Sequence, residues 1–292
     1  MTHITGDLHG GMTAYHVSPR AFKPAKRGDI VICTGDFGGV WWPDYHTNEK
    51  HRRDEDYFLE SKLRQRVQWL AVDGNHENFA RLFGGEFPLV EIYGGKAYQI
   101  RKNIFYLKRG EVFTIDGETF LAFGGARSHD KEPGWLTPAL AWSGFGGREW
   151  NKGRTEGVDW WPEEIPSEAD YENACRNLDR VGWRVDHVIS HTCPASQRQL
   201  FMRDLRKSDP TEAMLQRFLD NGLDFDFWHF GHFHLNEQSD KFYCHFDKVQ
   251  QLPLARKSFG DLLDLVTDEN IHTEVQTGAP VGKEFLSESG NR

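Results

Sequence analysis

Residues 67–83 read VQWLAVDGNHENFARLF, and our interpretation of the whole chain starts from this stretch. The apolar-leaning run 67–72 predicts a buried strand, and residues 78–83 predict a short helix. Between them stands DGNHE, at positions 73–77. An amide and an imidazole are poor core formers, and open α/β sheets place ligands at the carboxyl ends of their strands. We therefore interpret residues 73–77 as part of a functional site.

The same pattern recurs at other predicted strand ends. The β-branched run 30–34 is typical of a strand buried on both faces, and it ends in Gly35-Asp36. Near the N-terminus, Asp7 and His9 are two residues apart, so in an extended chain both side chains lie on one face. Two parallel strands with these ends would bring Asp7 and Asp36 side by side. Farther along, His191 follows a predicted strand at 187–190, and GHFH at 231–234 follows another at 226–230.

Composition limits the class of protein. The chain has 292 residues, of which 38% are hydrophobic and 27% are charged, as is ordinary for a globular protein. No run approaches the ~20 apolar residues of a membrane span, and we expect neither a signal peptide nor membrane association. Four cysteines without paired spacing argue against a disulfide framework and fit a cytoplasmic location. The net charge of −9 argues against extended nucleic-acid binding.

The order of predicted elements indicates two sheets. A helix within the charged segment 47–66 separates the second and third strands, and this β-α-β alternation predicts a parallel sheet. Short strands between residues 97 and 123 predict a second, largely antiparallel sheet, with a hairpin turn at Asp116-Gly117. Ser167 is a predicted N-cap for a helix that ends near residue 181. Another helix is expected at 211–219, and residues 242–246 are expected to continue the second sheet.

We expect one domain over residues 1–254 and a partly flexible C-terminal extension over 255–292. The domain contains a tryptophan-rich insertion at about 127–166, with Trp135, Trp142, Trp150, Trp160 and Trp161. A loop of this length in a compact domain is usually functional or disordered, and so many aromatic residues argue against disorder. Two interpretations stay open, a small satellite core and a stacking platform for a base.

The strand ends together offer a set of nitrogen and oxygen ligands without thiolate. These ligands are Asp7, His9, Asp36, Asn75, His191, His232 and His234, with His76 beside them. Such a set suits Mn²⁺, Fe or Zn²⁺. Seven ligands exceed one site, whereas two ions ~3.5–4 Å apart that share one carboxylate would use them all. A metal pair of this kind polarises a phosphoryl group and supplies hydroxide at neutral pH.

The order of these blocks resembles that of the calcineurin-like metallophosphoesterases, including bacterial and phage members and the Ser/Thr protein phosphatases. The family signature is Asp-x-His, Gly-Asp, Gly-Asn-His-Glu, a lone His and Gly-His-x-His, and every block is present between residues 6 and 234. The resemblance implies an α/β fold, a four-layer αββα sandwich of two mixed β-sheets flanked by helices. It also implies two divalent metal ions, for which we consider Mn, Fe, Zn and Ni.

The resemblance also assigns roles. It implies that one ion is held by Asp7, His9, Asp36 and His234. The other would be held by Asn75, His191, His232 and the shared Asp36. His76 would bind or protonate the leaving oxygen, so we expect His76 and Asp36 to be the catalytic residues. The other nine histidines are interpreted as ordinary residues outside the site: His3, His16, His46, His51, His129, His187, His229, His245 and His272. His129 is a partial exception, because it lies in the predicted substrate loop.

Two departures from the protein phosphatases bear on substrate. Those enzymes carry arginines after Gly-Asp and before Gly-Asn-His-Glu, where this chain has Phe37-Gly38-Gly39 and Asp73. The candidate replacement cations are Arg52, Arg53, Arg127 and Lys131. We favour Arg127, because it follows a predicted strand end. We expect a phosphomonoesterase acting on a phosphoprotein or a small phosphate ester. The alternatives are a phosphodiesterase acting on nucleotides or nucleic-acid ends, and a non-catalytic protein that binds metal or phosphate.

Overall fold

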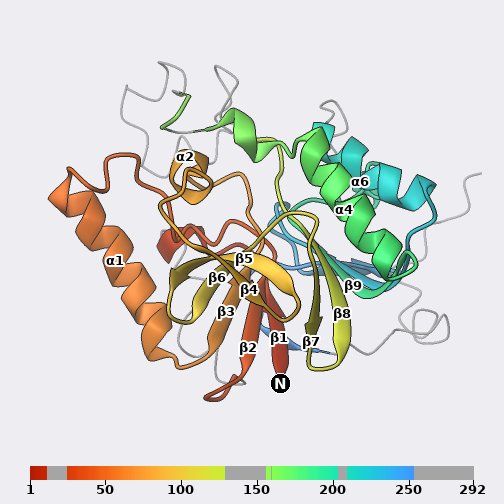
Figure 1. The fold of residues 1–292 in the computed structure, drawn as a ribbon, viewed down its shortest axis with the longest axis horizontal. Helices are drawn as coiled ribbons and strands as arrows, with labels where there is room; N and C mark the ends of the chain where they lie inside the picture. The colour runs from red at the N-terminus through yellow and green to blue at the C-terminus, as the bar shows by residue number, and fades with distance from the viewer. Residues whose placement is uncertain (12–24, 129–155, 159, 203–208, 253–292) are drawn as a thin grey trace, which may run out of the picture. The chain divides into compact units, whose positions relative to one another are not determined.

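The computed structural model describes residues 1–11, 25–128, 156–158, 160–202 and 209–252 (Figure 1). Contacts within the chain group Met1–Leu254 as one compact unit, separate from Ala255–Arg292. The predicted C-terminal extension lies outside the described residues, as do Trp135, Trp142 and Trp150 of the predicted insertion. Both stay predictions.

The first sheet has, within the described residues, seven strands in the order β13-β1-β2-β3-β6-β5-β4. Strands β1, β2, β3 and β6 run parallel, and antiparallel strands stand at both edges. The bounds are β1 Thr2–Thr5, β2 Ile30–Cys33, β3 Gln68–Ala71, β4 Leu89–Ile92, β5 Gly95–Arg101, β6 Ile104–Leu107 and β13 Gln250–Gln251. The parallel core confirms the β-α-β prediction for the first part of the chain.

The second sheet has, within the same residues, six strands in the order β11-β12-β10-β9-β8-β7. Its four inner strands β12, β10, β9 and β8 run parallel, and β11 and β7 are antiparallel to their neighbours. The bounds are β7 Val112–Ile115, β8 Glu118–Phe123, β9 Arg184–Ser190, β10 Asp224–Phe230, β11 Glu237–Ser239 and β12 Phe242–Cys244. Each sheet is therefore mixed, as expected.

The expectation that residues 97–123 build a largely antiparallel second sheet is wrong. Strands β5 and β6 join the first sheet, and only β7 and β8 belong to the second. Alternating hydrophobicity predicts a strand but not the sheet in which it pairs, and the chain crosses between sheets at 108–111. The hairpin prediction is confirmed, because Asp116 and Gly117 have φ of 51° and 89° between paired β7 and β8.

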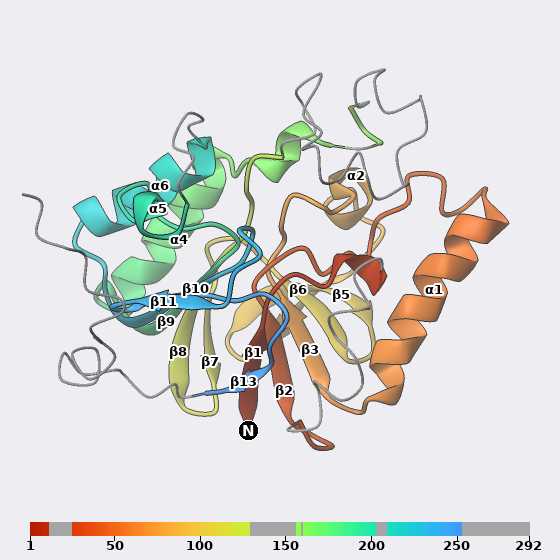
Figure 2. The same cartoon turned by 180° about the vertical axis from the view of Figure 1, so that it is seen from behind.

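Helices cover the outer faces of both sheets (Figures 1 and 2). Helix α1 (Glu49–Arg64) places Phe58 and Leu59 on the apolar face of the first sheet. Helices α4 (Glu168–Arg180) and α6 (Pro210–Asp220) cover the second sheet, and Ser167 caps α4 as predicted. A third apolar cluster, which includes Leu70 and Phe120, lies between the sheets. Three stacked cores confirm the four-layer αββα architecture.

The described part of the chain also contains four short helical elements. These are the 3₁₀ helices η1 (His9–Gly11) and η4 (Pro162–Glu164) and the helices α2 (Phe79–Leu82) and α5 (Arg198–Phe201). Among the described helices, none is long and apolar enough to cross a bilayer.

Candidate metal centre

The structure brings the predicted ligands together where strands of the two sheets end. Asp7 and His9 follow β1, Asp36 follows β2, and Asn75 follows β3. From the second sheet, His191 follows β9, and His232 and His234 follow β10. Three groups have ligand atoms within 4.8 Å of one another, and together they contain Asp7, His9, Asp36, His76, His191 and His234. Asn75 contacts His191, and the His232 ring centroid lies 5.0 Å from that of His191.

Asp36 is buried at the middle of this cluster. Its Oδ1 accepts the backbone N–H groups of Asn75 and His76, each at 2.8 Å. Its Oδ2 lies 3.3 Å from His191 Nε2 and 3.8 Å from His9 Nδ1. One carboxylate oxygen is thus fixed by the backbone after β3, and the other faces imidazoles from both sheets. A carboxylate shared by two ions would occupy this position.

Asp7 joins the two sheets in a similar way. Its Oδ2 accepts the backbone N–H of His232 at 3.0 Å and lies 3.2 Å from His234 Nε2. The Nε2 atoms of His234 and His9 are 3.1 Å apart. Residues 7, 9 and 234 therefore converge beside Asp36, as the sequence predicts.

The surroundings of His191 test whether a cation fits. Its Nδ1 lies 2.8 Å from the carbonyl oxygen of Thr34, which can only accept, so Nδ1 carries a hydrogen. In the neutral ring Nε2 then carries a lone pair, and it lies 3.1 Å from Asn75 Oδ1 and 3.3 Å from Asp36 Oδ2. Three acceptors this close to one another are stabilised by a positive charge between them, which a proton on Nε2 or a cation supplies. Imidazole nitrogen, carboxylate and amide oxygen fit a borderline divalent metal ion.

The protonation states agree with this interpretation. Burial opposes a charge on His191, but the Asp36 carboxylate and its hydrogen bond raise the pKa of His191 to about 10, so the site attracts positive charge. Burial would raise the pKa of Asp36, yet His191 and His76 hold it well below its ordinary value. Burial lowers the pKa of His9 to about 4, against the pull of Asp36. Asp36 is thus ionised and His9 neutral near pH 7, as ligands must be.

Left-handed backbone occurs at four residues of this centre. His9, Asp36, His232 and His234 have φ between 47° and 67°, a region that side-chain-bearing residues adopt rarely and at a cost. The glycines of the motifs have a different role, since they allow close approach. A Cβ at Gly74 would lie 2.0 Å from Asp36 Oδ1, and one at Gly231 would lie 2.2 Å from Asp7 Oδ1. The motif glycines thus let backbone reach the two central carboxylates.

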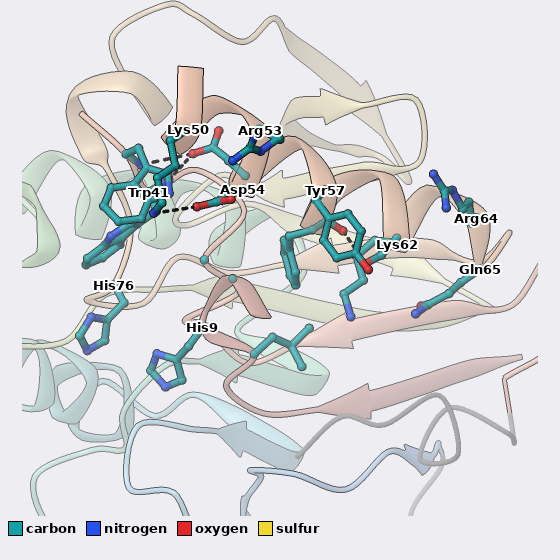
Figure 3. A pocket seen from close by; sticks show the side chains of 17 residues that line it. His9, Trp41, Lys50, Arg53, Asp54, Tyr57, Lys62, Arg64, Gln65 and His76 are labelled. Atoms are coloured by element: carbon teal, nitrogen blue, oxygen red, sulfur yellow. Dashed lines mark hydrogen bonds and ion pairs between the residues drawn. The ribbon is translucent and has the colours of Figure 1, made fainter. Parts of the chain in front are cut away.

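His76 lies where this centre opens to the surface. Its half-buried ring has its centroid 5.0 Å from that of His9. Both rings line a groove of about 1070 Å³ that continues along α1, with Trp41, Lys50 and Arg53 among its lining residues (Figure 3). Figure 3 shows His76, His9 and Trp41 at one end of this groove. Sequence reasoning predicted His76 but missed Trp41, whose only signal was an aromatic pair after a strand-end loop.

The position before Gly74 holds a buried ion pair that the sequence did not reveal. Asp73 Oδ2 accepts Arg109 Nε at 2.9 Å, and Arg109 also donates to the carbonyl oxygen of Glu163 at 2.9 Å. Both side chains are almost fully buried. Where the protein phosphatases have an arginine, this chain therefore has an acid that binds an arginine 36 residues away. Arg109 connects the end of β3 to η4, and no local pattern predicts such a contact.

The predicted substrate residue Arg127 is half-buried after β8, and its backbone N–H donates to Asp209 Oδ2 at 2.8 Å. Nothing tests its role, which stays a prediction. Of the other candidate cations, Arg53 lines the groove and Arg52 is exposed on α1. Lys131 lies outside the described residues.

Comparison with known proteins gives a family. A sequence model of the calcineurin-like phosphoesterases matches residues 2–236. No curated protein matches the chain. Among solved structures, the phosphopantetheinyl hydrolase of Mycobacterium tuberculosis is similar, with 15% sequence identity and a TM-score of 0.39, over 84% of this chain and 87% of that one.

Proposed function

Because the chain belongs to the calcineurin-like phosphoesterase family, whose members hydrolyse phosphate esters with metal ions, we propose that it is a phosphomonoesterase with a dinuclear centre. One observation carries the proposal. Asp36 Oδ2 faces imidazoles from both sheets while Oδ1 is fixed by the backbone of Asn75 and His76. This is the arrangement that a bridging carboxylate needs. All predicted ligands and His76 are present, which argues against the non-catalytic alternative.

The ligand assignment rests on the resemblance to the family, and the proximity of these side chains supports it. We propose that Asp7, His9, Asp36 and His234 hold one divalent ion. Asn75, His191, His232 and the shared Asp36 hold the other, and Mn, Fe, Zn and Ni all suit these donors. Two such ions polarise a phosphoryl group and stabilise charge on its oxygens. The chain's own contribution is to hold the ligands in place at the strand ends, with Asp36 ionised and His9 neutral.

His76 is the proposed proton donor to the leaving oxygen. Its backbone N–H binds Asp36 Oδ1, so the position of its imidazole depends directly on the central carboxylate. Its ring faces the groove, where the leaving group of a substrate would lie (Figure 3). An imidazole is suited to transferring a proton near neutral pH. Arg127 is proposed to contact the substrate from the end of β8.

Two features bear on whether the substrate is a phosphate monoester or a diester: the sequence of the Gly-Asn-His-Glu block and the room in the groove. The Gly-Asn-His-Glu block favours a monoesterase of the phosphatase type, acting on a phosphoprotein or a small phosphate ester. The groove that runs on from His76 along α1 favours the second candidate, a phosphodiesterase, because it leaves room for a second esterified group. Hydrolysis of nitrophenyl phosphate and bis-nitrophenyl phosphate, each with Mn²⁺, Ni²⁺, Zn²⁺ and Mg²⁺, tests this choice. Faster turnover of the diester would overturn the monoesterase proposal.

A further inference from the structure

We propose that Trp41 is a stacking surface for the base of a nucleotide, which would make a nucleoside phosphate the substrate. This inference rests on the proposed function and specifies its leaving group. The Trp41 ring centroid lies 5.5 Å from that of His76, the proposed proton donor. A planar group joined to the oxygen that leaves toward His76 would therefore meet the indole of Trp41.

The indole is available on the side of the groove. Trp41 is half-buried, and Trp161 packs edge-on against it, with ring centroids 5.8 Å apart and planes at 75°. Trp161 itself is buried and also contacts Phe79. The aromatic core thus supports Trp41 from one side, while Trp41 lines the groove beside His76 and His9 (Figure 3).

The segment that carries Trp41 is held rigidly. The backbone N–H groups of Trp41 and Trp42 both donate to Glu55 Oε2, at 2.9 and 3.3 Å. Glu55 in turn forms a buried two-bond ion pair with Arg81, and Arg81 also donates to the carbonyl oxygen of Trp42 at 3.1 Å. On the other side, Asn78 donates to the carbonyl oxygen of Trp41 at 3.3 Å. A binding surface fixed in this way loses little conformational entropy when a ligand arrives.

The positively charged side chains in the groove suit a nucleotide, which carries both a negative phosphate and an aromatic base. Lys50 and Arg53 of α1 line the same groove as Trp41, and both side chains are exposed. Two acids, Asp54 and Glu55, line the groove with them. Asp54 forms an ion pair with Lys50 at 3.3 Å, and Glu55 is paired with Arg81. Stacking on aromatic side chains together with nearby cations is how proteins hold single nucleotides and unpaired strands. The acidic net charge of the whole chain restricts the ligand to a nucleotide or the end of a strand.

The adjacent residue, Trp42, differs from Trp41 in how its ring is packed. Trp42 stacks face to face on His51, with ring centroids 3.7 Å apart and planes at 6°. One face of Trp42 is therefore already covered by the protein's own ring. Trp41 has edge and tilted contacts instead, with Trp161 at 75° and His76 at 40°. The two adjacent indoles differ in this respect, and Trp41 is the one beside the centre.

The test compares ligands that differ only in the base. With metal-loaded protein, turnover of adenosine monophosphate is compared with turnover of ribose 5-phosphate, and calorimetry compares binding of adenosine with binding of ribose. The variants are Trp41→Leu, which removes the ring, and Trp41→Phe, which keeps a smaller one. Trp183→Phe, on the far side of the second sheet, is the matched control. A short oligonucleotide with a terminal phosphate, assayed beside adenosine monophosphate, distinguishes a strand end from a free nucleotide.

We expect wild-type protein to bind adenosine roughly ten-fold more tightly than ribose, and to show a similar difference in KM between the two esters. Trp41→Leu should lose this preference, so that adenosine and ribose bind equally, whereas Trp41→Phe and Trp183→Phe should keep it. Equal affinity for adenosine and ribose, or a preference that survives Trp41→Leu, would overturn the inference. If neither ester is hydrolysed but the binding preference depends on Trp41, the proposed function fails and the stacking role stands.

Discussion

Strands β9 and β10 carry two clusters of histidines that differ in almost every respect except residue type. At the strand ends, His191 and His232 lie in the candidate metal centre. Three to four residues earlier on the same strands, His187 and His229 form a row with His245 between the sheets. In this row His187 Nδ1 lies 3.0 Å from His229 Nε2, and His229 Nδ1 lies 3.0 Å from His245 Nε2. The row ends at Glu118, whose Oε2 lies 3.2 Å from His187 Nε2.

The two clusters differ in the partners of their imidazoles, and this difference distinguishes a candidate metal centre from a buried hydrogen-bonded row. Each imidazole of the buried row satisfies the next, and burial lowers the pKa of His245 to about 3 and that of His229 well below its ordinary value. The row is therefore neutral. At the strand ends, Asp7 and Asp36 stand between the rings and attract positive charge. Among the described residues, every group able to hold an ion contains one of these two carboxylates.

The largest effect is expected when the carboxylate of Asp36, which the two proposed ions share, is removed. Asp36→Asn keeps the size of the side chain but removes the carboxylate that faces His9 and His191. We expect the variant to lose paired metal binding and all measurable hydrolysis of phosphate esters, because neither ion keeps its full ligand set. Activity across Mn²⁺, Ni²⁺ and Zn²⁺ concentrations measures this. Hydrolysis at near wild-type rates at any of these concentrations would contradict the role of Asp36.

His76→Ala should have the next largest effect. His76 belongs to the centre by position but is not an assigned ligand, so metal content should stay close to that of wild type. Turnover should fall by about 10²–10⁴-fold if its imidazole donates a proton to the leaving oxygen. The loss should shrink for a substrate with a good leaving group such as nitrophenolate. Wild-type turnover in this variant would remove His76 from the mechanism.

Substitution within the buried row should affect stability and spare the metal centre. His229→Leu leaves the ring nitrogens of His187 and His245 without their partner inside the sandwich. Unsatisfied buried groups of this kind cost about 1–3 kcal/mol each, so the free energy of unfolding should fall by roughly 2–6 kcal/mol. Urea denaturation measures the change, and metal content is the control. Loss of bound metal from the folded variant would show that the two clusters are not independent.

The pH dependence of stability should reveal the row as well. The folded pKa of His245, about 3, lies below its ordinary value of 6.5, so the unfolded chain binds a proton that the folded chain excludes. The free energy of unfolding should therefore fall as pH drops from about 6.5 toward 3, by up to about 1.4 kcal/mol per pH unit for each such histidine. Urea titrations at pH 7 and pH 5 should show a smaller decrease in His229→Leu than in wild type. An equal decrease in both proteins would contradict the neutral row.

The candidate ligands were predictable because their signals are local. A strand that ends in Gly-Asp or Gly-Asn-His shows in a few consecutive residues, and the order of five such blocks indicated one site. The same is true of the hairpin at Asp116-Gly117 and the cap at Ser167. The sequence analysis also left His187, His229 and His245 out of the site, and the structure places them in the buried row.

The features that were missed depend on contacts between distant segments. The pairing of β5 and β6 with the first sheet is decided by the packing of whole layers, which alternation within a strand does not encode. The Asp73–Arg109 pair and the Glu55–Arg81 pair under Trp41 join residues 36 and 26 positions apart. The left-handed backbone at Asp36 and His232 is likewise imposed by the site as a whole.

Anomalous diffraction from crystals grown with Mn²⁺ tests the central claim most directly, because it locates the ions as well as counting them. Our account predicts two peaks at the strand ends, one between His9 and Asp36 and one between Asp36 and His191, and no peak along His187, His229 and His245. In Asp36→Asn at least one of the two peaks should vanish. A single peak in wild-type crystals, or a peak within the buried row, would contradict the account.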